Sequence, residues 1–202
     1  VCSSDLLSID NVKTCAVAAG LNLNDGATIT VTYTAHLNDK AAVNTTSGST
    51  DNKNKVQLQY SNNPRPGEYW GTTPKSEVYV YTYQLNNTKY HDDDNENNKL
   101  EGAGFRLYSD KACTPEQEVK LYKKDNFYYP IKDATDKAQD AVEMFSDEHG
   151  QFNVKGLDAG TYYLKETNPP ADYSACANKE IVISATHDGN RVNLESSKLY
   201  TT

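Results

Sequence analysis

The sequence predicts an all-β protein made of two tandem β-sandwich domains. Its 202 residues exceed the roughly 100 to 150 that a single hydrophobic core usually serves. Tyrosine dominates the aromatic residues, with 15 Tyr against 4 Phe and 1 Trp. β-Branched and aromatic side chains suit a pleated, half-buried surface. Several short stretches also alternate apolar and polar residues with the period of two that is typical of a strand.

Three stretches of the first half alternate in this way. They are residues 28–35 (TITVTYTA), 55–60 (KVQLQY) and 77–85 (EVYVYTYQL). A polar run at 44–54 and a Pro- and Gly-rich run at 61–75 separate them and indicate loops. The alternating pattern ends near Gln84, so we place a domain boundary between residues 84 and 85.

The second half begins with a predicted hairpin. One strand lies around Lys89, an acidic loop covers residues 91–98, and Phe105 and Leu107 share a face of the returning strand. Further strands are predicted at residues 118–122, 151–154, 161–166 and 180–185. A short helix is predicted at residues 133–144. About six short strands in this half favour a sandwich.

Charge and motifs exclude several classes of function. The net charge of -8 and the lack of a basic cluster argue against a nucleic-acid partner. No apolar stretch approaches the roughly 18 to 20 residues that span a bilayer, so no membrane segment is expected. The four histidines and four cysteines fall into no metal-ligand or nucleophile motif, so we expect a non-enzymatic protein without metal or cofactor.

The cysteine-bearing segments raise two further points. Cys113 and Cys176 either form a disulfide or remain two free thiols, since both fall in the second half and an oxidising compartment permits either state. Val1 to Leu6 (VCSSDL) is also what a common sequencing-adapter oligonucleotide encodes in one reading frame. We therefore treat residues 1–6 as a candidate artefact.

Two phrases of the second half resemble a known family. LEGAGFRLY (100–108) and GLDAGTYYLKETNPPADY (156–173) are similar to the collagen-adhesin B-type domain of Gram-positive surface proteins, with YLKET (163–167) as its E-box. The first half resembles the end of the preceding domain in sortase-assembled fimbrial shaft subunits. The resemblance implies two Ig-like or prealbumin-like sandwiches, residues 1–84 truncated at the N-terminus and residues 85–202 truncated at the C-terminus.

The resemblance also implies an intramolecular isopeptide bond between lysine and asparagine. Lys89 would be the nucleophile and Glu166 the acid that moves its proton. The acceptor is expected just past Thr202, with Asn193 as a fallback. In the first domain Asn54 matches the acceptor, and its lysine is expected upstream of Val1. Strand parity agrees, because Lys89 shares a face with Leu85 and Asn87, and Glu166 shares one with Tyr162 and Leu164.

The function implied by this resemblance is a structural subunit of a pilus shaft. Such a subunit is extracellular and anchored to the cell wall, and its partners are other pilin subunits, joined by sortase through regions outside this chain. An alternative is the stalk of a surface adhesin that binds host matrix or a glycan. Flanking sequence would separate the two, since a pilin lysine motif upstream and a C-terminal sorting signal favour the shaft.

Overall fold

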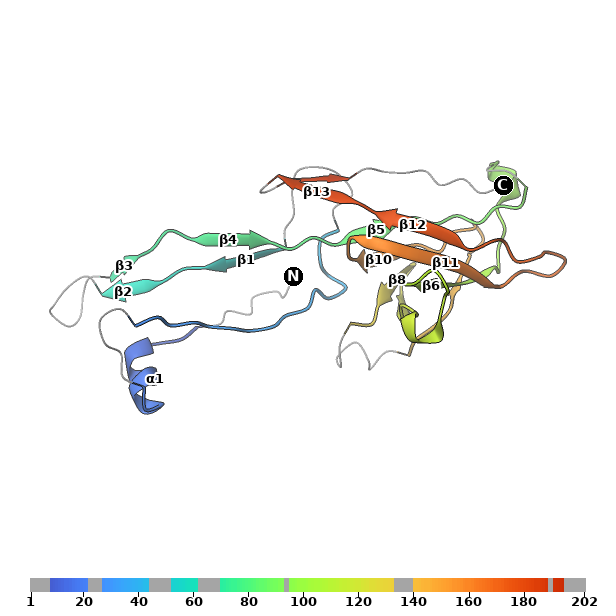
Figure 1. Ribbon diagram of the computed structural model, residues 1–202. Helices are drawn as coiled ribbons and strands as arrows, with labels where there is room; N and C mark the ends of the chain where they lie inside the picture. The colour runs from blue at the N-terminus through green and yellow to red at the C-terminus, as the bar shows by residue number, and fades with distance from the viewer. Residues whose placement is uncertain are drawn as a thin grey trace.

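Two four-stranded sheets face each other in the C-terminal part of the computed structural model (Figure 1). The structure describes residues 8–21, 27–43, 52–61, 70–92, 95–132, 140–188 and 191–194. The first sheet contains, in spatial order, β5 (Tyr83–Leu85), β10 (Val154–Leu157), β8 (Phe127–Pro130) and β7 (Leu121–Lys124). The second contains β12 (Lys179–Ile183), β11 (Gly160–Asn168), β6 (Gly104–Tyr108) and β9 (Met144–Phe145). The predicted all-β sandwich fold is confirmed.

Apolar side chains from both sheets fill the space between them. The buried cluster consists of Ala103, Phe105, Leu107, Leu121, Tyr128, Met144, Phe152, Val154 and Leu157. Within this cluster the rings of Phe105 and Phe152 stack with centroids 4.2 Å apart. Burial of each large apolar side chain contributes about 1.5 to 3 kcal/mol. The cluster therefore holds the two sheets together, and polar groups enter it only where they find partners.

The predicted hairpin forms only around its acidic loop, which an antiparallel bridge between Tyr90 and Lys99 closes, and it does not continue into β6 (Gly104–Tyr108). Strand β6 pairs with β11 and β9, whereas the segment around Lys89 makes single bridges, Thr88 with Gln151 and Tyr90 with Lys99. The 3-10 helix η1 (Glu96–Asn98) turns the chain between them. The long strand β11 pairs with all five residues of β6, and Phe105 lies opposite Glu166 in this ladder and is buried in the core.

Other predicted strands shift by a few residues or break. The stretch 77–85 divides into β4 (Ser76–Tyr79) and β5, and 55–60 divides into β1 (Lys53–Val56) and β2 (Gln59–Ser61). The break after β4 marks a change of partner, since β4 pairs with β1 but β5 pairs with β10. The predicted boundary at Gln84 thus lies inside β5.

The N-terminal part is a narrow ribbon that leads away from the sandwich (Figure 1). Strand β1 pairs with β4, and β2 pairs with β3 (Trp70–Thr72). The predicted strand at residues 28–35 is wrong, because these residues form no strand and Ile29, Val31 and Tyr33 are exposed. Alternation alone cannot make a strand without a neighbour to complete its ladder. A helix that the pattern did not predict, α1 (Val12–Ala18), is capped by Asn11.

Two further segments complete the described chain. The predicted helix at 133–144 falls partly on residues 133–139, which lie outside the described residues. Its remainder is not helical, since residues 140–143 form no element and Met144 begins β9, where it is fully buried. A terminal hairpin joins β13 (Ala185–Asp188) to β14 (Arg191–Leu194). A second 3-10 helix, η2 (Pro115–Gln117), precedes β7.

Candidate functional site

A lysine and a glutamate meet at the edge of the hydrophobic core. Lys89 Nζ lies 3.1 Å from Glu166 Oε2 and donates a hydrogen bond to it. The side chain of Glu166 is 0% exposed and that of Lys89 is 15% exposed. We call Lys89 and Glu166 the buried pair. Charged side chains are rarely buried unless they are paired, so this contact singles out both residues.

The alternation of β11 places Glu166 in the core. Residues Tyr162, Leu164 and Glu166 share the face that packs on the cluster, and Glu166 lies opposite Phe105 of β6. The ladder shifts register between Glu166 and Asn168. Such an irregularity increases the local bend of a strand and aims its side chains differently from those of a regular strand.

Main-chain hydrogen bonds position Lys89 from both sides. Its N–H donates to Gly150 O at 2.8 Å, and its carbonyl accepts from Leu100 N at 3.0 Å. Gly150 has φ +70°, and a Cβ at that position would lie 2.6 Å from Lys89 O. Glycine adopts a positive φ without strain, and its lack of a Cβ leaves room for the carbonyl. The Lys89 ammonium also lies 5.9 Å from the ring centroid of Phe105.

The two oxygens of Glu166 have different surroundings. Oε2 accepts from Lys89 Nζ and, at 2.7 Å, from the main-chain N–H of Cys176. Oε1 is buried and has no hydrogen-bond partner among the described residues. A buried acceptor without a donor is unfavourable. This oxygen is therefore free to serve a group that the described part of the chain does not supply.

Cys176, expected from the sequence to be either a disulfide partner or a free thiol, also belongs to this site. Burial raises the pKa of its thiol, a hydrogen bond to Glu166 and the charge of Glu166 raise it further, and Lys89 opposes them. The proximity depends on the path of the chain between β11 and β12. No local sequence pattern predicts that Cys176 lies next to Glu166.

The structure contains free thiols at Cys113 and Cys176, which corrects the disulfide alternative. Cys176 faces Glu166 on the core side of β11. Cys113 accepts from Asn178 Nδ2 at 3.4 Å and lies near Lys165, whose side chain points to the other face of the same strand.

Asn193 is not brought to the buried pair. It lies in β14 and pairs with Thr186 of β13, which follows the end of β12 at Ile183. Ile183 pairs with Gly160, at the opposite end of β11 from Glu166. Six residues of strand span about 20 Å. The hairpin that carries Asn193 therefore starts far from Glu166.

Asn54 lies outside the sandwich. It is exposed on β1, pairs with Val78 of β4 and donates to the hydroxyl of Tyr33. The described residues place no lysine amine in hydrogen-bond contact with it. The ion pair nearest in sequence joins Lys55 to Glu77.

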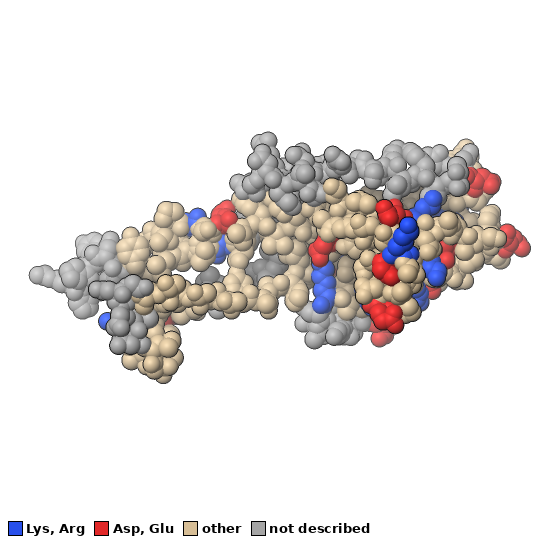
Figure 2. All heavy atoms as spheres, in the orientation of Figure 1, with Lys and Arg blue, Asp and Glu red and all other residues tan. Residues whose placement is uncertain are grey.

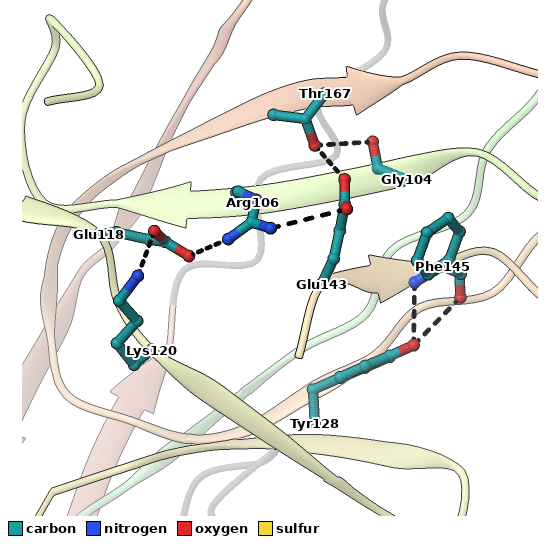
Figure 3. Close-up of polar contacts among 8 residues, drawn as sticks. All are labelled: Gly104, Arg106, Glu118, Lys120, Tyr128, Glu143, Phe145 and Thr167. Carbon is teal, nitrogen blue, oxygen red and sulfur yellow. Dashed lines mark hydrogen bonds and ion pairs between the residues drawn. The ribbon is translucent and has the colours of Figure 1, made fainter. Parts of the chain in front are cut away.

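A separate polar network braces the outer face of the second sheet (Figure 3). Arg106 of β6 lies between Glu118 at 2.6 Å and Glu143 at 3.7 Å. Lys120 pairs with the other oxygen of Glu118, and Thr167 donates to Glu143. Burial opposes ionisation of Glu118, but its hydrogen bonds to Lys120 and Arg106 outweigh it and lower its pKa. The network ties the segments before β7 and β9 to β6 and β11.

Outside the buried pair, we looked for clusters of charge and of metal-ligating side chains among the described residues. On the face shown in Figure 2, basic side chains of the sandwich lie beside acidic ones. The described residues contain no group of three or more His, Cys, Asp and Glu side chains that could hold a metal ion. Within the same residues, no helix has the length and apolar character needed to cross a membrane.

The two facing four-stranded sheets form a β-sandwich, and the buried pair lies within it. Residues 86–198 match the family described as SpaA, prealbumin-like fold domain. The match covers more than half of the 202 residues, so the chain belongs to this family. A search of curated protein sequences finds no significant match.

Solved pilin structures are also similar to this chain. The shaft pilin SpaA of Lactobacillus rhamnosus GG is 25% identical over 56% of this chain and 51% of its own, with a TM-score of 0.39. The group B streptococcus pilus 2b backbone protein is 23% identical over 60% and 39%, with a TM-score of 0.38. A streptococcal ancillary pilin is 22% identical over 54% and 30%, with a TM-score of 0.40. The chain thus spans about half the length of the first and less of the other two.

Proposed function

We propose that this chain is part of a structural subunit of a cell-surface pilus shaft, and that its sandwich is closed by an isopeptide bond from Lys89. The observation that carries the proposal is the 3.1 Å contact between Lys89 Nζ and a fully buried Glu166. Membership of the SpaA prealbumin-like family supports it. In this role the chain is a mechanical element rather than an enzyme.

The proposed chemistry needs a lysine, a carboxyl group and an asparagine. Transfer of a proton from Lys89 to Glu166 gives a neutral amine beside a carboxylic acid. The amine attacks the side-chain carbonyl carbon of the asparagine, and the bond from that carbon to its nitrogen breaks. Glu166 gives its proton to the departing nitrogen and takes one proton from the attacking nitrogen, so it ends protonated. The products are one new amide and one NH₃. Lysine and asparagine side chains do not react with each other in water. Holding them close together in a core that excludes water lowers the barrier to this reaction.

A covalent link between the first and last strands suits a shaft. It prevents a pulled domain from unravelling and restricts the unfolded chain, as a disulfide does, with a contribution of about 2 to 4 kcal/mol. We place the assembled protein at the surface of a Gram-positive cell, with other pilin subunits as partners. Linkage by sortase would use regions outside these 202 residues.

The acceptor is proposed to follow Thr202, with Asn193 as the fallback within the chain. The free Glu166 Oε1 supports an acceptor that approaches the buried pair from outside the described residues. The position of β14 beyond the Gly160 end of β11 favours the later residue over Asn193.

Intact-mass measurement tests the bond. A chain that continues through its natural C-terminal residues should weigh about 17 Da less than its sequence predicts, since ammonia is lost. Lys89→Ala and Glu166→Ala should both restore the full mass. Lys155→Ala, which alters a lysine that lies over the Phe127 ring in the other sheet, should keep the loss. Peptide mapping of the cross-link identifies the acceptor, and full mass in the unaltered protein would contradict the proposal.

A further inference from the structure

The connection between β11 and β12 returns to Glu166. Leu164 of β11 pairs with Lys179 of β12, and the ladder between them ends there. If β12 extended in register, Ala177 would lie opposite Glu166 and the main-chain groups of both strands would bond to each other. Instead, the chain carries the N–H of Cys176 to the Glu166 side chain.

The main-chain contact from Cys176 is the shorter of the two nitrogen contacts to Glu166 Oε2. Its N–H lies 2.7 Å from Oε2, whereas Lys89 Nζ lies 3.1 Å from the same oxygen. A hydrogen bond from a main-chain donor to a carboxylate is charge-assisted and directional. Two donors on one oxygen restrict rotation of the carboxyl group, so Oε1 keeps one orientation in the core.

We propose that the main-chain N–H of Cys176 is a positioning group for the Glu166 carboxyl. It holds Oε2 beside Lys89 and leaves Oε1, the buried oxygen without a donor, directed toward the incoming acceptor. The chemical use of this arrangement rests on the proposed isopeptide function. The hydrogen bond itself is a property of the folded chain and does not need an acceptor.

The donor is the main-chain N–H of residue 176, so replacing the Cys176 side chain should leave the hydrogen bond to Glu166 intact. Cys176→Ala and Cys176→Ser both retain the N–H. The decisive change replaces the amide nitrogen of residue 176 with an ester oxygen, through the α-hydroxy analogue of alanine. The ester chain and the Cys176→Ala chain then differ only in that one linkage.

A double-mutant cycle on the 202-residue chain measures the coupling. Four chains are unfolded in urea: amide or ester at residue 176, each with Glu166 or with Glu166→Met, which removes the acceptor at similar volume. We expect the ester to lower the folding equilibrium constant about tenfold more in the Glu166 background than in the Glu166→Met background. A factor of about ten corresponds to the loss of one hydrogen bond to a charged group. An equal effect in both backgrounds would show that residue 176 is merely structural and overturn the proposal.

A second measurement does not depend on whether the ester chain folds. In the unaltered chain, a scalar coupling should connect the amide nitrogen of Cys176 to the carboxyl carbon of Glu166 across the hydrogen bond. Its absence in a folded chain would overturn the proposal. Coupling without ammonia loss in the longer protein would reject the isopeptide function alone. Ammonia loss without coupling would reject only the role of Cys176.

Discussion

The thiol of Cys176 is a natural probe of the buried pair. Burial raises its pKa, and the hydrogen bond and negative charge of Glu166 raise it further, while Lys89 lowers it. Glu166→Gln should therefore lower the thiol pKa and speed alkylation by iodoacetamide near pH 8. Lys89→Met should raise the pKa and slow the reaction, because only the thiolate is nucleophilic.

The pH dependence of alkylation, followed by peptide mass spectrometry, checks this prediction. Cys15 is exposed and lies outside the sandwich, so its rate should be the same in all three chains. Equal Cys176 profiles in the three chains would mean that the sulfur does not sense the buried pair.

At the scale of elements, the turn at Gly150 helps to position Lys89, because its carbonyl accepts the hydrogen bond from the Lys89 N–H. Gly150→Ala adds a Cβ 2.6 Å from Lys89 O at a positive φ, so the backbone must shift. Gly102→Ala is the matched control, since Gly102 has φ +82° but open space around the new Cβ. The control should cost only the backbone strain of about 1 kcal/mol.

Urea unfolding of the two glycine variants provides the comparison. We expect Gly150→Ala to be less stable than Gly102→Ala by at least about 1 kcal/mol, in the range of overpacking costs. Similar losses in both would show that the Lys89 segment tolerates displacement.

The network around Arg106 offers a second prediction for the elements. Arg106→Met leaves Glu118 and Glu143, whose side chains are 11% and 19% exposed, without their shared cation. We expect a loss of about 2 kcal/mol in the free energy of unfolding, the value for hydrogen bonds to charged groups.

Lys120→Met is the control for Arg106→Met. The side chain of Lys120 is 50% exposed, so its pair with Glu118 should contribute less than about 1 kcal/mol. The pKa of Glu118 in the folded chain lies below the ordinary glutamate value of 4.5, so its ionised form contributes stability above that value. As pH falls below 4.5 this contribution is lost, and the destabilisation caused by Arg106→Met should shrink. A loss that is independent of pH would exclude the ionic origin.

The whole molecule should lose stability in alkali. Burial is the main reason why the pKa values of several sandwich side chains are raised. They are the hydroxyls of Tyr83, Tyr108, Tyr129 and Tyr162 and the thiols of Cys113 and Cys176. The unfolded chain then loses these protons first. Stability should be complete below about pH 9 and fall as pH rises through the ordinary thiol and tyrosine values of 9.0 and 10.0.

Urea unfolding between pH 8 and pH 11 measures this loss. Tyr162→Phe removes one of the contributing hydroxyls, which donates to Asp158 O at 3.0 Å. The variant should be less stable than the parent at pH 8 and should lose less stability on the way to pH 11. A parent chain whose stability is constant over this range would contradict the prediction.

The sequence by itself determined which residues prefer strands and which side chains share a face. The alternation of residues 161–166 predicted most of β11 and placed Glu166 on the same side as Tyr162 and Leu164. This works because side-chain direction in a strand has a strict period of two. The family resemblance of residues 100–108 and 156–173 then predicted a sandwich, which the fold confirms.

Only the tertiary structure decided which strands are neighbours. It paired β6 with β11 and β9 rather than with the segment around Lys89, left residues 28–35 without a sheet, and carried Cys176 to Glu166. The physical reason is that main-chain hydrogen bonds are the same for every residue except proline. Alternation therefore identifies a buried face, but packing of the whole core selects the partner and the register.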